Sequence, residues 1–283
     1  MKNTPNQLFP YYGGKATLAS TVIEVIKEFN HRVYVEPFCG GASIFFQKQQ
    51  STFPKKNAVH VLNDLNDLII TAYRVAIEQP EKLEKKLKSS LYSESLFRKA
   101  KHIVENPEEF TDLDIAWAVI YKIRSSFCNK LDGTWGRSKK GNYEVETYNN
   151  FLEYLPSVLK ELRQATISSE DAIACIKRWD SPETLFYVDP PYPNTGQGHY
   201  AGYTQSDFEK LIETLKNAKG TVVLSCYPNE AVPADWEKIS IRRRCPINFS
   251  RQITDSFRTE VIWTKPGVEM DRVRWEQINL IAA

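Results

Sequence analysis

Short apolar runs that alternate with helical segments limit the fold of this 283-residue chain more than any other feature. The runs are rich in β-branched and aromatic residues and are bounded by polar or turn residues, as strands buried on both faces of a sheet are. Five strands are expected, at residues 32–35, 58–62, 185–188, 221–224 and 261–263. The alternation predicts an α/β fold with a largely parallel sheet.

Helices are expected between several of these strands, at residues 18–29 and 207–218. The second of them ends before Gly220 and has apolar residues at helical spacing, namely Phe208, Leu211, Ile212 and Leu215. Residues 73–148 break the alternation. A charged helix over 82–104, a second helix over 112–127 and a polar loop over 129–142 predict a helical insertion there. The expected division is therefore 1–72, 73–148 and 149–283.

Composition sets further limits on function. The net charge of +2 neither demands nor excludes a nucleic-acid partner, so the position of the positive charges matters more than their sum. Five cysteines lie far apart without the spacing of a zinc or redox site, and four scattered histidines offer no metal spacing. The polar N-terminal segment and the lack of an apolar run of ~20 residues predict a cytoplasmic protein without a membrane span.

The tetrapeptide Asp189-Pro190-Pro191-Tyr192 directly follows the strand expected at 185–188. Ligands of open α/β sheets bind beyond the carboxyl ends of strands, where this motif lies. The two prolines stiffen the backbone, so the Asp189 carboxylate and the Pro190 carbonyl become fixed acceptors. Such a pair could bond both hydrogens of an aromatic amine and free its lone pair, while Tyr192 offers a face for a stacked base. A proline-rich turn without chemistry is the alternative.

Three weaker motifs accompany this tetrapeptide. A glycine turn, Glu36-Pro37-Phe38-Cys39-Gly40-Gly41-Ala42-Ser43, follows the first strand and would let a ligand approach the backbone closely. It matches neither the dinucleotide fingerprint nor a phosphate loop. Asn63-Asp64 ends the second strand, where such folds bind ribose hydroxyls or simply turn. Tyr11-Tyr12-Gly13-Gly14-Lys15 precedes the first helix, and Lys15 could pair with a carboxylate.

Taken in order, the four motifs resemble those of the Dam-type (DPPY, α-group) adenine-specific DNA methyltransferases. Further similarity lies at residues 136–140 and 258–263. The resemblance implies a Rossmann-like, S-adenosylmethionine-dependent methyltransferase sheet with an inserted, mainly helical target-recognition domain. It also implies site-specific transfer of a methyl group to the exocyclic amine of adenine in duplex DNA, by base flipping and direct in-line transfer.

The same resemblance implies roles for individual residues. The target amine would be held by the catalytic residues Asp189, Pro190, Pro191 and Tyr192. Asp64 would take the ribose hydroxyls of the cofactor, and residues 36–41 would surround its methionine part. The full set of expected cofactor contacts is Tyr11, Lys15, Glu36, Pro37, Phe38, Gly40, Asp64, Asp171 and Asp189. No covalent enzyme intermediate is required.

A basic stretch within the insertion is the expected DNA contact. Residues 122–140 hold six cations against one acid, interleaved with two aromatic residues. The cations suit phosphates and the rings could wedge into or stack on bases. The DNA-binding residues we expect are Arg124, Phe127, Lys130, Trp135, Arg137, Lys139 and Lys140. Family members that read GATC have Asn-Gly after the aromatic residue and a longer loop, whereas this chain has Phe127-Cys128-Asn129, so GATC is not assumed.

Alternatives remain open at this point. A methyltransferase acting on cytosine, on RNA adenine or on a glutamine side chain would use a similar pair of acceptors. A non-catalytic DNA-binding relic would keep the fold without the chemistry. We expect a monomer that acts on double-stranded DNA, with a cognate restriction endonuclease as a further partner. Residues 194–203 as a lid and Arg242-Arg243-Arg244 as a second DNA contact are weaker hypotheses.

Overall fold

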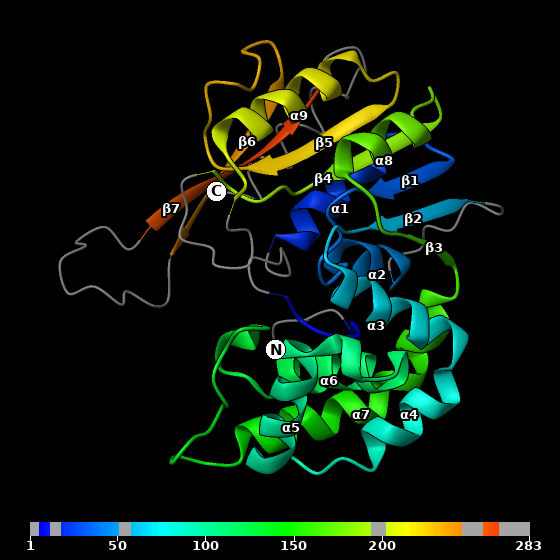
Figure 1. Cartoon of the computed structure of the whole chain (residues 1–283). Helices are drawn as coiled ribbons and strands as arrows, with labels where there is room; N and C mark the ends of the chain where they lie inside the picture. Colours follow the sequence, from blue (N-terminus) through cyan, green and yellow to red (C-terminus); the bar gives the residue numbers. More distant parts are fainter. Residues whose placement is uncertain (1–5, 12–17, 51–57, 194–201, 245–256, 266–283) are drawn as a thin grey trace. The chain divides into compact units, whose positions relative to one another are not determined.

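The computed structural model describes residues 6–11, 18–50, 58–193, 202–244 and 257–265 (Figure 1). The chain divides into two compact units. The first unit comprises residues 1–19 and 39–172, and the second comprises residues 20–38 and 173–283. Both units combine helices with strands, so the α/β class predicted from the sequence is confirmed.

In its described residues, the second unit contains five strands in the order β1-β4-β5-β7-β6. β1 (Val33–Glu36), β4 (Thr184–Val188) and β5 (Thr221–Cys226) are parallel neighbours. β7 (Phe257–Thr264) pairs antiparallel with β5, and β6 (Glu237–Arg244) pairs antiparallel with β7. Every residue of β4 is buried, as expected for a central strand that is covered on both faces. The parallel arrangement expected for the first, third and fourth predicted strands is confirmed, whereas β7 and β6 are antiparallel. Of these five strands, only β6 was not predicted.

Three helices accompany this part of the sheet: α1 (Ala19–Lys27), α8 (Ala172–Trp179) and α9 (Gln205–Asn217). A capping box formed by Thr204 and Asp207 starts α9, because each side chain accepts a backbone N–H that the helix itself leaves unbonded. The four apolar residues predicted for its inner face are buried. α1 and α9 confirm the helices predicted at residues 18–29 and 207–218, whereas α8 was not predicted.

The first unit combines a parallel strand pair with most of the helices. β2 (Val59–Asn63) pairs with β3 (Ala165–Ser168), and α2 (Ser43–Gln50) follows the glycine turn. The other helices are α3 (Asp67–Glu78), α4 (Pro80–Lys88), α5 (Glu94–Glu105), α6 (Asp112–Ser125) and α7 (Tyr143–Leu162), with 3-10 turns at Pro107–Glu109 and Phe127–Asn129.

Helix α6 forms the core of this helical part. Ten of its fourteen residues are buried, and it packs against α3, α4, α5 and α7. A helix that is apolar on nearly all sides has to be surrounded by other elements. α6 therefore holds the neighbouring helices together. The loop that follows it begins at residue 126, next to this well-packed helix.

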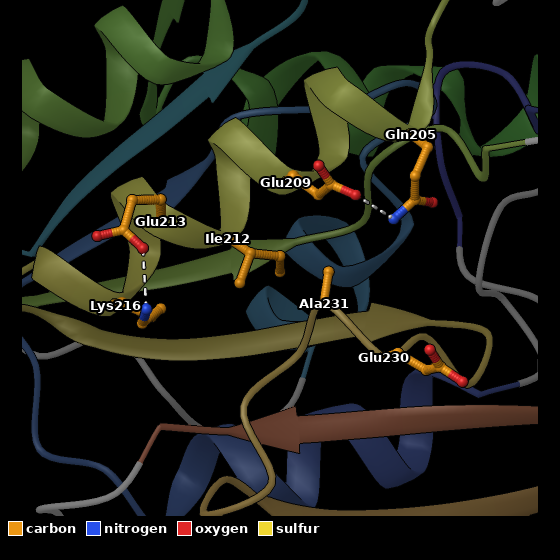
Figure 2. A pocket seen from close by; sticks show the side chains of 7 residues that line it. All are labelled: Gln205, Glu209, Ile212, Glu213, Lys216, Glu230 and Ala231. Atoms are coloured by element: carbon orange, nitrogen blue, oxygen red, sulfur yellow. Dashed lines mark hydrogen bonds and ion pairs between the residues drawn. The ribbon is translucent and has the colours of Figure 1, made fainter.

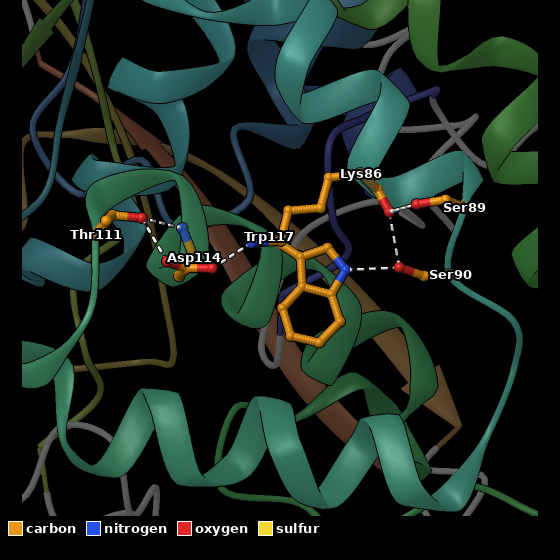
Figure 3. Close-up of polar contacts among 6 residues, drawn as sticks. All are labelled: Lys86, Ser89, Ser90, Thr111, Asp114 and Trp117. Atoms are coloured by element: carbon orange, nitrogen blue, oxygen red, sulfur yellow. Dashed lines mark hydrogen bonds and ion pairs between the residues drawn. The ribbon is translucent and has the colours of Figure 1, made fainter.

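The single charged helix predicted over residues 82–104 is wrong, because α4 ends at Lys88 and α5 begins at Glu94. Within the break, the Ser90 hydroxyl accepts the indole N–H of Trp117 at 2.8 Å and donates to the Lys86 carbonyl at 2.7 Å (Figure 3). Lys86 in turn pairs with Asp114 and lies over the Trp117 ring. These bonds to α6 end the helix, and charge periodicity alone could not show them.

The predicted domain boundaries at residues 72 and 148 stay a prediction. The helices between them belong to the same compact unit as β2 and β3. Among the helices of the described residues, none has both the length and the apolar character that a membrane crossing requires.

Candidate functional site

The Asp-Pro-Pro-Tyr motif begins where β4 ends, in a strand flanked by parallel β1 and β5. Pro190 and Pro191 are buried, whereas Asp189 is partly exposed. Tyr192 is 8% exposed, and its hydroxyl lies 3.5 Å from Asp189 Oδ1, the outer limit of a hydrogen bond. The motif therefore holds a carboxylate and an aromatic ring together at the carboxyl end of a central strand.

A second ring supports Tyr192. Tyr227, the residue after β5, packs against it with ring centroids 4.3 Å apart and planes inclined by 51°. Burial raises the pKa of Tyr192 well above its usual value, and the carboxylates of Asp189 and Glu260 raise it further. Tyr192 thus stays a neutral phenol and offers a surface rather than a base. The sequence analysis missed Tyr227, because a lone tyrosine after a strand carries no signal.

The end of β1 carries a buried carboxylate. The Tyr34 hydroxyl donates to Glu36 Oε1 at 2.8 Å, and both residues are buried. Burial and then the Glu36 charge raise the pKa of Tyr34. Pro37 is buried as well, while Phe38 is partly exposed with its ring edge-on to that of Tyr203. A buried carboxylate favours a cationic ligand group beside it.

The glycine turn of the first unit needs its glycines for contacts within the protein. Gly40 has a φ of +47°, and a Cβ there would lie 2.9 Å from Cδ1 of Tyr11. A Cβ on Gly41 would lie 2.9 Å from the Phe9 carbonyl oxygen. The second left-handed residue is Ala42, with a φ of +49°. The left-handed residues are therefore two apart, and an alanine occupies the second of these positions.

Asp64 lies at the end of β2 and is tied to this turn. Its Oδ2 accepts the Gly40 N–H at 2.9 Å, and its Oδ1 accepts the Asn66 N–H at 3.0 Å. Asp64 is 5% exposed, and burial raises its pKa although the backbone N–H groups of Asn66, Gly40 and Leu65 lower it. The next residue, Leu65, is 72% exposed and was not predicted as part of the site. A buried acceptor thus adjoins an exposed apolar side chain.

The loop after β3 is joined to the same strand end. The Asn63 side chain donates to the Glu170 carbonyl and accepts the Glu170 N–H, both at 3.0 Å. The Asp64 N–H also donates to the Ser168 carbonyl at 3.4 Å. Asp171, one of the predicted cofactor contacts, is exposed in this loop. Asn63 therefore has a clear structural role that the dipeptide Asn63-Asp64 did not reveal.

The predicted motif around Lys15 is only partly described. Tyr11 lies on the glycine turn and is partly exposed. Tyr12 to Lys15 lie outside the described residues, as do residues 194–201 of the lid hypothesis and the side chains of Arg242 to Arg244.

The basic stretch predicted to bind DNA divides into exposed and inward-facing side chains. Phe127 is 53% exposed, while Lys130 and Trp135 are partly buried, and Trp135 packs near Tyr92. Three cations of the loop are exposed: Arg137, Lys139 and Lys140. The loop turns at Cys128 and Asn129, whose φ values are +60° and +53°. Left-handed backbone favours Asn and Gly, which are the residues that GATC-reading relatives place there.

The structure does not support the predicted DNA contact of Arg124. Its guanidinium donates to the carbonyls of Gln7 and Leu8 and lies 3.8 Å above the Phe151 ring. Lys122 also faces inward, donates to the Leu131 carbonyl and lies over the Phe97 ring. Both cations are on α6, which other elements cover on nearly all sides. A basic residue there therefore makes contacts within the unit.

A cavity of about 390 Å³ lies along α9 in the second unit (Figure 2). Its walls come from α9 and the segment after β5, through Gln205, Glu209, Ile212, Glu213, Lys216, Glu230 and Ala231. Its single cation, Lys216, is paired with Glu213. None of the predicted site residues contributes to it, and we assign it no role.

Comparison with known proteins shows to which family a chain with these motifs belongs. Residues 11–265 match the model of the D12 class N6 adenine-specific DNA methyltransferases. The chain belongs to this family. The matched region contains the turn at Gly40, Asp64, the helical part with its basic loop, and the Asp189–Tyr192 motif, so the Dam-type resemblance is confirmed.

Two relatives are themselves named as methyltransferases. The type II methyltransferase M.MjaIII of Methanocaldococcus jannaschii is 29% identical over 217 residues, which cover 69% of this chain and 72% of that protein. The type II methyltransferase M1.LlaDCHI of Lactococcus lactis subsp. cremoris is 25% identical over 234 residues, or 75% and 77% of the two chains.

Family membership settles the class of reaction. This chain is an adenine-specific DNA methyltransferase, and DNA is its substrate. The alternatives of a cytosine, RNA or glutamine methyltransferase and of a non-catalytic relic are therefore set aside. Adenine-specific DNA methylation is therefore the reaction in which the roles of buried Asp64, the Tyr192 ring and the exposed loop cations are to be interpreted.

Proposed function

We propose that this enzyme takes its methyl group from S-adenosylmethionine and acts on an adenine that has been flipped out of duplex DNA. The observation that carries the proposal is the pairing of Asp189 with the buried, ring-supported Tyr192 at the end of β4. Bound S-adenosylmethionine supplies an electrophilic methyl group on a positively charged sulfur. The residues of this chain then have to bind the donor, hold the amine and bind the duplex.

The residues of the first unit fit an adenosyl group. Each Asp64 oxygen accepts one backbone N–H, and a carboxylate has about four acceptor sites, so acceptors remain for ribose hydroxyls. Exposed Leu65 offers an apolar surface for the purine, with Asp171 as the proposed partner of its polar edge. Close packing of Tyr11 on Gly40 and of the Phe9 carbonyl on Gly41 fixes the turn beside Asp64. We propose that Tyr11 and Lys15 contribute further contacts.

The residues of the second unit fit the methionine part and the target base. Glu36, with Pro37 and Phe38, would attract the ammonium group of the donor. The Asp189 carboxylate and the Pro190 carbonyl would accept the two amine hydrogens and hold the nitrogen lone pair toward the methyl group. Positive charge would develop on that nitrogen as its bond to the methyl carbon forms and the carbon–sulfur bond breaks, with S-adenosylhomocysteine as the leaving group. The negative charge of Asp189 would stabilise the nitrogen until it loses one proton to solvent. Tyr192, supported by Pro191 and Tyr227, would stack on the flipped adenine.

The loop after α6 is the proposed DNA contact. Its exposed side chains, Phe127, Arg137, Lys139 and Lys140, suit phosphates and bases. The partly buried Lys130 and Trp135 complete the proposed set. Because the two relatives are named type II methyltransferases, we also propose a cognate restriction endonuclease in the same cytoplasm. We propose that the methyltransferase itself acts as a monomer.

Two measurements test this function. Long-read sequencing of DNA from a methylase-free host that expresses the chain would define the target site. A duplex with that site is then incubated with S-adenosylmethionine carrying a labelled methyl group, and N6-methyladenine is expected as the product. A second duplex carries 2-aminopurine at the target position, and its fluorescence should rise on binding to wild type and less on binding to Tyr192→Ala. Tight binding without a fluorescence change would exclude base flipping, and absence of label in adenine would exclude the donor.

A further inference from the structure

Arg124 connects helix α6 to the segment that precedes the glycine turn. Its Nε donates to the Leu8 carbonyl at 3.0 Å, and a second guanidinium nitrogen donates to the Gln7 carbonyl. The rings of Phe151 and Tyr154 cover the guanidinium at 3.8 and 5.6 Å. Two consecutive carbonyls on one planar fork fix both the position and the direction of the backbone at residues 7–8.

The segment held by Arg124 leads directly to the glycine turn. Leu8 and Phe9 are fully buried, and the Phe9 ring lies 5.2 Å from that of Tyr73 on α3. The Phe9 carbonyl packs against Gly41, and the Tyr11 ring packs against Gly40, in both cases too closely for a side chain on the glycine. A shift of residues 7–11 would therefore shift the surface against which the turn is built.

The peptide groups on either side of Gly40 are hydrogen-bonded as well. Tyr73 donates its hydroxyl to the Gly40 carbonyl at 2.8 Å, and Asp64 accepts the Gly40 N–H at 2.9 Å. A continuous series of contacts thus runs from Arg124 through residues 7–11 and Tyr73 to Gly40 and Asp64. All of these residues lie within the first unit.

We propose that Arg124 and Tyr73 are positioning residues for cofactor binding, which hold the Gly40 turn and Asp64 in the geometry that the donor requires. The inference rests on the proposed use of S-adenosylmethionine at Gly40 and Asp64. Arg124, a basic residue beside the loop after α6, would then contribute to cofactor affinity rather than to DNA affinity. Tyr73 holds the turn directly, and Arg124 holds it through the N-terminal segment.

The test uses Arg124→Lys and Tyr73→Phe in the full chain. Lysine keeps the charge but cannot bond two carbonyls with one planar group, and phenylalanine removes only the hydroxyl. S-adenosylhomocysteine binding, measured by calorimetry, should weaken about five- to twenty-fold for Arg124→Lys and about three- to ten-fold for Tyr73→Phe. The KM for S-adenosylmethionine should rise in parallel, while kcat at saturating cofactor and the salt dependence of DNA binding stay as in wild type.

A matched control is Arg98→Lys, because Arg98 is an exposed arginine of the same helical part, paired with Glu94. It should bind S-adenosylhomocysteine like wild type. A lower kcat with unchanged KM for Arg124→Lys would mean that Arg124 only contributes to the stability of the fold. Weaker specific DNA binding with unchanged cofactor affinity would mean that Arg124 belongs to the DNA interface. If Arg124→Lys does not fold, Tyr73→Phe decides. If the wild-type protein does not bind S-adenosylhomocysteine, the proposed function is overturned. If the wild-type protein binds it and both variants bind it equally tightly, the proposed function stands and only this inference fails.

Discussion

Charged side chains occupy two contrasting regions of this methyltransferase. At the strand ends and on α6, Glu36, Asp64 and Lys122 are buried and bonded to hydroxyl or backbone groups. In the loop after α6, Arg137, Lys139 and Lys140 are exposed to solvent. Both regions lie within residues 11–265, which match the family model, yet only the first holds its charges in fixed geometry. The difference indicates that position relative to the core, rather than residue type, decides what a charge does.

The two settings predict different responses to mutation. A buried charge acts at short range in a poorly screened medium, so its loss is costly and nearly independent of salt. An exposed cation acts on a phosphate through screened attraction, so its loss is small and depends on salt. Each experiment below either separates the two regions further or shows that the distinction is not valid.

The largest effect is expected for Asp189→Ala at the carboxyl end of β4. Loss of the carboxylate removes an acceptor that is needed mainly in the transition state, so kcat should fall ~10²-fold or more. S-adenosylhomocysteine binding should weaken only modestly. Single-turnover methylation of the target duplex measures the first quantity and calorimetry the second. A variant that retains more than about a tenth of wild-type turnover would show that Asp189 does not hold the amine.

Asp64→Ala should weaken cofactor binding about ten- to a hundred-fold while DNA affinity stays nearly constant. The reason is that an ionised carboxylate bonded to two hydroxyls contributes ~1.5–3 kcal/mol. Calorimetric titration with S-adenosylhomocysteine is the measurement, and DNA binding at fixed salt is the control. An unchanged dissociation constant would mean that Asp64 only closes the turn on the Gly40 N–H.

The raised pKa of Asp64 predicts a pH dependence of the same affinity. Burial raises the pKa, so Asp64 takes up its proton at a higher pH than an ordinary aspartate and loses an acceptor site for ribose. Cofactor affinity should therefore fall on acidification above the usual aspartate range. The sign for stability is opposite: protonation of a group whose pKa is raised by folding favours the folded state in that window. Asp64→Asn should show weak binding with a flat profile, and an equal pH dependence in both proteins would exclude Asp64 as the cause.

Lys122 tests the inward-facing side of the basic stretch. Lys122→Ala should lower the free energy of unfolding by about 1–3 kcal/mol, because it removes a buried hydrogen bond to the Leu131 carbonyl and a packed stem. Lys122→Met keeps the stem and should recover part of the loss. Chemical denaturation measures stability, and the salt slope of DNA binding should be unchanged. Wild-type stability combined with a smaller salt slope would place Lys122 at the DNA.

The sequence predicted most of the strands, and the position of Asp189–Tyr192 directly after one of them, because both depend on local pattern. A strand buried on both faces, such as β4, is apolar throughout, and Asp189 follows it directly. The break at Ser90 and the inward role of Arg124 depend on partners far away in the chain, Trp117 for the first and Gln7 with Leu8 for the second. Likewise, Ala42 adopts a left-handed backbone conformation that favours glycine, which its residue type does not indicate. Local periodicity contains none of this information.

The smallest and most specific effects are expected in the exposed loop. If Lys139 and Lys140 contact phosphates, Lys139→Ala and Lys140→Ala should each weaken binding equally on specific and scrambled duplexes and reduce the salt slope by about one. If Arg137 contacts a base edge, Arg137→Ala should cost ~1–3 kcal/mol on the proper site and relax discrimination at one position. Thermal stability should be unchanged in all three because these side chains are exposed. Binding constants over a salt series decide the matter, and wild-type behaviour of all three variants at every salt concentration would mean that DNA is bound elsewhere on the chain.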